Sequence, residues 1–129
     1  MNDTISTDSS PILRTLAMPA DTNPSGDIFG GWVMSQMDIA GSICAVERAR
    51  GRTATVAVEG MSFIAPVKVG DVLCVYTSLE RVGTTSMTVN VEAWARRRTE
   101  PDIRTKVTEG RFVYVALGDD GLKRRIGAP

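Results

Sequence analysis

The feature that most constrains this chain is an almost uncharged stretch, residues 28–46, in which Asp38 is the only charged side chain. The apolar residues of this stretch fall on nearly every side of a helical wheel, which predicts one long helix from about residue 30 to about residue 50. A helix that is apolar almost all round must be buried. The rest of the chain therefore has to surround it, and we expect a second copy to cover what one small sheet cannot.

Everything after the predicted helix has the composition of β-strands. In the segment 84–97 apolar and polar residues alternate with a period of two, and the apolar face consists of Met87, Val89, Val91, Ala93 and Ala95. Strands are predicted over residues 10–18, 53–63, 72–82, 84–97 and 105–117, with a polar loop at 97–104. The order of one strand, one helix and then four strands predicts an α+β fold, in which an antiparallel sheet wraps around one central helix.

The length of 129 residues fits a single domain. We assign residues 10–126 to that domain and residues 127–129 to a C-terminal tail. Residues 1–9 are polar and include neither a basic segment nor an apolar one, so we expect a flexible N-terminal tail rather than a secretory signal.

Composition excludes several classes of function. Fifteen basic and fifteen acidic residues cancel, which argues against nucleic acid as a partner, although short basic clusters occur at 96–98 and 123–125. The absence of histidine excludes a Ser-His-Asp triad and histidine-ligated metal sites, so we expect no metal. The serines, glycines and acid of the stretch 28–46 argue against a membrane span. Two cysteines and no export signal favour the cytoplasm.

Asp38 has two interpretations that the helix alone leaves open. Its carboxylate either caps a neighbouring backbone or pairs with an arginine across an interface, or it is partly desolvated in order to react. Small residues beside it on the helix, including Gly41, would let another backbone or a thin substrate approach closely. Without histidine, a carboxylate is the leading candidate for proton transfer.

The residues before the helix favour the reactive interpretation. Gly30 and Gly31 lie at the predicted helix N-terminus, where unpaired N–H groups can stabilise an oxyanion, although an ordinary glycine turn is the equal alternative. Asn23, in the loop before them, could orient water or a carbonyl group, or could serve only its own turn.

These residues are also the ones that carry a family resemblance. The run RTLAMPADTNPSGDIFGGWVMSQMDIAG, at residues 14–41, closely resembles the YciA-type acyl-CoA thioesterases of the hotdog-fold superfamily. The segments at 58–71, 83–94 and 112–117 continue the match in order, so that it covers roughly residues 12–126. The resemblance implies a hotdog fold, dimers joined edge to edge into one continuous sheet, and further assembly into a trimer of dimers.

The resemblance also implies an activity, the hydrolysis of acyl-CoA to free CoA and a carboxylic acid, with no cofactor besides the CoA of the substrate. It makes Asp38 the general base for water or a nucleophile, and Asn23 a residue that acts across the dimer interface with the aspartate of the other subunit. Gly30 and Gly31 would polarise the thioester carbonyl. The preferred acyl length is left open.

The resemblance assigns further residues to substrate binding, and four of them have a structural alternative. Arg96 and Arg97 would pair with a CoA phosphate or form a solvated strand end, and Met61 and Phe63 would line the acyl channel or pack in the core. The loop expected near the nucleotide consists of Gly83, Thr84, Thr85 and Ser86. A non-catalytic acyl-CoA-binding sensor on the same fold is the alternative function.

Overall fold

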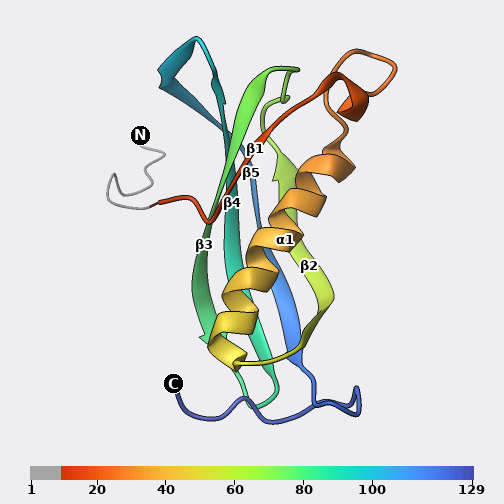
Figure 1. Cartoon of the computed structure of the whole chain (residues 1–129), viewed down its shortest axis with the longest axis vertical. Coiled ribbons are helices and arrows are strands. Elements are labelled where there is room, and N and C mark those ends of the chain that lie inside the picture. The colour runs from red at the N-terminus through yellow and green to blue at the C-terminus, as the bar shows by residue number, and fades with distance from the viewer. Residues whose placement is uncertain (1–9) are drawn as a thin grey trace.

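The computed structural model describes residues 10–129; the predicted N-terminal tail lies outside them. One 20-residue helix crosses a single antiparallel sheet, and a short 3₁₀ turn, Pro19–Asp21, precedes the helix (Figure 1). The elements are β1 (Leu13–Leu16), α1 (Gly30–Ala49), β2 (Thr53–Phe63), β3 (Asp71–Val82), β4 (Ser86–Arg97) and β5 (Glu100–Ala116). The predicted α+β architecture and the predicted limits of the helix are confirmed.

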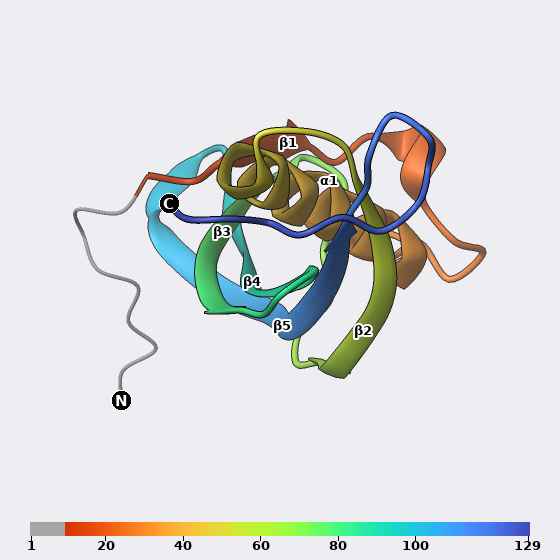
Figure 2. The same ribbon diagram turned by 90° about the horizontal axis from the view of Figure 1, so that it is seen from below.

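The sheet has the strand order β1-β3-β4-β5-β2, and every neighbouring pair is antiparallel. Seen from below, the strands curve around α1 and hold it on their concave side (Figure 2). Strand β2 follows the helix directly in sequence but forms one edge of the sheet, beside the last strand. This crossover places the residues just after the helix next to residues near the end of the chain.

The core lies between the helix and the concave face of the sheet. Met37 and Ala40 of α1 are fully buried there, as is Tyr114 of β5. The predicted apolar face of β4 is also completely buried, which confirms the period of two; it consists of Met87, Val89, Val91, Ala93 and Ala95. The alternation of β4 and the apolar stripe of α1 thus meet in one core.

The predicted loop at 97–104 is wrong over most of its length, because β5 already begins at Glu100. Arg97 pairs with Glu100 across a two-residue turn, so β4 and β5 form a long hairpin. The loop was predicted because these residues are polar, but polar residues also suit an exposed hairpin. Pro101 lacks an N–H group, but it is tolerated here because β2 pairs with β5 only from Thr108 onward, which leaves that edge of the proline segment unpaired.

The segment after β5 caps the C-terminal end of α1. Arg124 donates from Nη2 to the carbonyl of Ala49 at 2.7 Å and from Nε to the carbonyl of Leu117 at 3.1 Å. A cation at a helix C-terminus satisfies free carbonyl groups and complements the helix dipole. One residue of the basic cluster at 123–125 therefore has a structural role.

The side of α1 that faces away from the sheet remains largely uncovered in a single chain. Ile39 is 46% exposed, and Met34, Val46 and, on the adjacent edge strand β2, Val56 are also exposed. An apolar surface of this kind is typical of an interface between proteins. No helix among residues 10–129 is long and apolar enough to cross a membrane.

We predict that Met37→Ala lowers the free energy of unfolding by about 2–5 kcal/mol, because it empties a fully buried position beneath the helix. Leu122→Ala, at a position that is 67% exposed, is the control and should change stability by less than about 0.5 kcal/mol. Both are measured by urea unfolding at one protein concentration. Equal effects of the two variants would contradict this placement of the core.

Candidate active site

Asp38 lies in the middle of α1, half-buried, and its carboxylate is held by two hydroxyl groups from the sheet. Thr55 of β2 donates from Oγ1 to Oδ1 of Asp38 at 2.7 Å. Tyr114 of β5 donates to the same oxygen at 3.0 Å and is equally close to the main-chain carbonyl of Asp38. No arginine among the described residues pairs with Asp38, whereas the predicted alternative, an arginine across an interface, concerns a second chain.

The two donors are neighbours because of the way β2 pairs with β5. Thr55 lies opposite Tyr114 in the register, and Val58 lies opposite Phe112. Phe112 and Tyr114 are two residues apart and both buried, whereas their partners are three residues apart. An irregularity of the ladder between Thr55 and Ala57 supplies the extra residue and turns both partners toward the helix.

Tyr114 can reach Asp38 because residue 41 of the helix is glycine. A β-carbon at Gly41 would lie 2.2 Å from the tyrosine hydroxyl oxygen, which is far inside van der Waals contact. The sequence analysis expected a backbone or a substrate to use this space, whereas the phenol of the same chain fills it. Burial, and then the hydrogen bond to Asp38, raise the pKa of Tyr114 far above its ordinary value.

Asp38 lines a pocket of about 270 Å³ that lies between α1 and β2. Gly31, at the start of the helix, lines the same pocket, so the structure brings these two predicted residues together. The other lining residues are Met34, Ser35, Thr55, Val58 and Phe112. Both hydroxyl donors use Oδ1, and no donor among residues 10–129 reaches Oδ2. Oδ2 is therefore available as a proton acceptor.

The start of the helix presents free amide groups. The N–H groups of Trp32 and Val33 donate to the carbonyl of Phe29, whereas those of Gly30 and Gly31 have no acceptor among the described residues. Phe29, which precedes the helix, provides no side-chain cap. Such free N–H groups, together with the helix dipole, favour an oxygen that carries negative charge.

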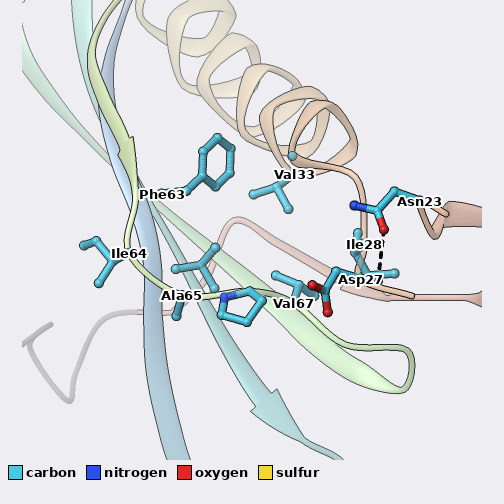
Figure 3. A pocket seen from close by; sticks show the side chains of 11 residues that line it. Asn23, Asp27, Ile28, Val33, Phe63, Ile64, Ala65 and Val67 are labelled. Atoms are coloured by element: carbon cyan, nitrogen blue, oxygen red, sulfur yellow. Dashed lines mark hydrogen bonds between the residues drawn. The ribbon is translucent and has the colours of Figure 1, made fainter. Parts of the chain in front are cut away.

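Asn23 and Gly30 line a different cavity, of about 330 Å³, together with Phe63 (Figure 3). The side-chain oxygen of Asn23 accepts hydrogen bonds from the main-chain N–H groups of Ser25 (2.9 Å) and Asp27 (3.1 Å). The oxygen of Asn23 thus supports its own loop, as asparagine commonly does in turns. Its amide nitrogen is turned toward the cavity (Figure 3). A single chain therefore divides the predicted catalytic residues between two cavities.

The two predicted acyl-channel residues also have different surroundings. The ring of Phe63 reaches the start of the helix, where its Cζ would lie 3.2 Å from a β-carbon at Gly30. Met61 packs instead against the hydrophobic core. Its side chain also fills the space above Gly110 of β5. Within one chain Met61 matches its structural alternative, core packing.

The predicted CoA contacts lie at opposite ends of β4 (Figure 1). The turn 83–86 connects β3 to β4, and its carbonyl groups accept hydrogen bonds from Ala116 and Ile126. Arg96 lies ten residues along the strand, roughly 33 Å away at ~3.3 Å per residue. One chain does not bring these two groups together.

Arg96 and Arg97 line a third cavity, of about 380 Å³, beside the β4–β5 hairpin. Arg97 is already engaged there, because its Nε lies 2.7 Å from Oδ1 of Asp71. Asp71 is buried, and its other oxygen accepts the main-chain N–H of Lys68 at 2.9 Å. Arg97 thus neutralises a buried carboxylate, whereas Arg96 forms no ion pair within the described chain.

Cys44 is another residue of α1 whose side chain could act as a nucleophile. It is half-buried, and burial raises the pKa of its thiol, with a smaller contribution in the same direction from the charge of Glu47. A raised pKa lowers the fraction of thiolate, which is the nucleophilic form. Asp38 remains the stronger candidate on this helix.

Comparison with known proteins identifies the family. Residues 25–101 match the thioesterase superfamily. The acyl-CoA thioester hydrolase YciA of Salmonella typhimurium is 56% identical over 115 residues, which are 88% of this chain and 86% of the relative. The chain belongs to the YciA-type acyl-CoA thioester hydrolases.

Solved structures agree with this assignment and confirm the predicted hotdog fold. A hexameric thioesterase from Yersinia pestis matches with a TM-score of 0.89 and 50% identity, covering 95% of this chain and 98% of its own. An aspartate-to-alanine mutant of HI0827, a hexameric acyl-coenzyme A thioesterase of broad specificity, matches with a TM-score of 0.87 and 48% identity, over 93% and 88% of the two chains.

Within this YciA-type chain, we predict that Arg97→Gln lowers the free energy of unfolding by about 1–3 kcal/mol, because it leaves the buried carboxylate of Asp71 without its cation. Arg98→Gln, one residue further in the exposed turn, is the control and should be close to neutral. Thermal unfolding of the two variants measures the difference. Unchanged stability with weakened CoA binding in Arg97→Gln would reverse this assignment.

Proposed function

We propose that the chain hydrolyses acyl-CoA thioesters and that Asp38 is the general base that activates water. The single observation that carries this proposal is the state of the Asp38 carboxylate. Oδ1 holds both hydrogen bonds from the sheet, and Oδ2 is left without a donor at the edge of a pocket that Gly31 also lines. A half-buried acid with one free oxygen is suited to accepting a proton from water.

The free N–H groups at the start of α1 supply the second part of the chemistry. Gly31 and Asp38 are seven residues apart, or roughly 10 Å at ~1.5 Å per helical residue, which leaves room for a thioester carbonyl and one water between them. In the proposed arrangement the amides of Gly30 and Gly31 bind the carbonyl oxygen and stabilise the negative charge that develops on it.

The proposed reaction proceeds by addition and elimination. Oδ2 of Asp38 takes a proton from water as the water oxygen bonds to the carbonyl carbon, and the carbonyl π electrons move to the oxygen. When that oxygen re-forms its double bond, the C–S bond breaks and CoA leaves as a thiolate, which takes up the proton from Asp38 and so restores the base. Because a thiol of pKa about 8.5 is a good leaving group, this route requires no histidine as an acid, and no metal or further cofactor.

We further propose that a second copy of the chain completes the site. Asn23 lies in a different cavity from Asp38, the outer face of α1 is apolar and exposed, and β2 is an edge strand beside that face. Pairing of two chains along β2 would cover the exposed face and allow the partner subunit's Asn23 to reach the pocket of Asp38. The hexameric state of the solved relatives favours assembly as a trimer of dimers.

We propose that residues of three segments contact the substrate. Arg96 is the better candidate for a CoA phosphate, because Arg97 already holds Asp71. Phe63 lines a cavity next to the helix start and is proposed to contact the acyl chain, with Met61 packed behind it. The turn Gly83-Thr84-Thr85-Ser86 is proposed to bind the nucleotide from another subunit. The cytoplasm, where CoA thioesters and free thiols such as Cys74 coexist, is the proposed compartment.

We predict that Asp38→Asn lowers kcat at least ~10²-fold and leaves a folded oligomer, because asparagine keeps the shape of the side chain but cannot accept the proton. Asp119→Asn, in an exposed turn, is the matched control and should retain full activity. The measurement is the release of free CoA thiol from acyl-CoA substrates of different chain lengths. Near-normal turnover in Asp38→Asn would refute the role of Asp38, and binding of acyl-CoA by the wild type without thiol release would favour a sensor.

A further inference from the structure

We propose that Tyr114 is a positioning residue for catalysis, which holds the carboxylate of Asp38 in the one orientation that directs its free oxygen toward substrate. The inference rests on the proposed role of Asp38 as the base. It adds a residue on the last strand, 76 positions away in sequence, to the machinery of that base. Gly41 is part of the same arrangement, because the absence of a side chain at this position leaves the space in which the Tyr114 hydroxyl reaches Asp38.

The geometry around the carboxylate supports this role. The hydroxyl of Tyr114 lies 3.0 Å from both Oδ1 and the main-chain carbonyl of Asp38, so it ties the side chain to its own helical backbone. Thr55 donates to the same Oδ1 at 2.7 Å from the neighbouring strand. Two donors on one oxygen restrict the rotation of a carboxylate, and they leave Oδ2 without a donor beside the pocket that Asp38 lines.

The phenol itself is held rigidly. Its side chain is fully buried, and its ring stacks on Phe112 with the centroids 6.5 Å apart and an angle of 17° between the planes. A buried hydroxyl whose pKa is raised remains protonated at every working pH and therefore always donates. Because the side chain is inaccessible, Tyr114 does not touch substrate and acts only through Asp38.

The helix is adapted to this contact at Gly41. A glycine inside a helix costs stability relative to alanine, about 1 kcal/mol in an exposed position. A methyl group here would lie 2.2 Å from the hydroxyl and 3.0 Å from the ring carbon that bears it, so alanine would displace the phenol or the helix. The small residue and the tyrosine are thus interdependent, and this interdependence can be measured.

The first test compares two tyrosines. Tyr114→Phe removes only the hydroxyl that reaches Asp38, and Tyr76→Phe removes the hydroxyl that accepts from Arg104 on the other face of the sheet. Tyr76 is the only other tyrosine in the chain. We expect kcat to fall at least ~10-fold in Tyr114→Phe, the effect of one hydrogen bond to a charged group, with KM and Tm close to those of the wild type. Tyr76→Phe should keep the wild-type kcat.

The second test is a double-mutant cycle between Gly41 and Tyr114. Gly41→Ala should lower kcat about as much as Tyr114→Phe does, because it displaces the same hydroxyl. Since that hydroxyl can be lost only once, the double variant should lie within about 3-fold of Tyr114→Phe alone rather than at the product of the two effects. Multiplicative losses would overturn the proposal.

The remaining outcomes separate this inference from the proposed function. Wild-type kcat in Tyr114→Phe, or a loss that appears only with dissociation of the oligomer or a large fall in Tm, would overturn the positioning role. If Asp38→Asn is inactive in the same assay, the general base stands and only the inference about Tyr114 fails. If Asp38→Asn turns over normally, the proposed role of Asp38 as the general base fails, and the inference about Tyr114 fails with it.

Discussion

The structure depends on how one acid is held between a helix and a curved sheet. Asp38 lies on an otherwise uncharged stretch of α1, and two hydroxyl groups from neighbouring strands secure one of its oxygens. The irregular register of β2 turns Thr55 inward, and Gly41 admits the phenol of Tyr114. Helix packing, strand register and one glycine therefore converge on the orientation of a single carboxylate.

The same packing is the reason for our proposal that a second chain completes the site. The sheet covers only one side of α1. The pocket that Asp38 lines lies at the edge of this covered side, next to the edge strand β2. The exposed apolar side chains there would be costly in an isolated monomer. We propose that one dimer interface serves two purposes. It covers these side chains, and it also encloses the thioester and brings Asn23 of the partner subunit to the pocket of Asp38.

The parts that the sequence predicts well are those with local signals. The uncharged stretch predicts α1 to within a residue at each end, and the period of two predicts the buried face of β4. The loop at 97–104 was mispredicted because its polar residues suit an exposed hairpin equally well, and Pro101 is tolerated in a strand whose second edge is unpaired. Thr55 and Tyr114 carry no local signal of their role. They meet through a register and an irregularity that depend on β2 crossing over to pair with β5. The only hint was Gly41, a glycine inside a helix.

The central claim is that each active site combines Asp38 of one subunit with Asn23 of another. The most direct measurement co-expresses two poorly active variants, Asn23→Ala and Asp38→Ala, in equal amounts and assays thiol release by the purified mixed oligomers. If the site spans two subunits, half of the dimers are mixed and each of those regains one intact site, so about a quarter of wild-type activity should return. If both residues act within one chain, every site carries a mutation. Activity no higher than that of the separate variants would contradict the account.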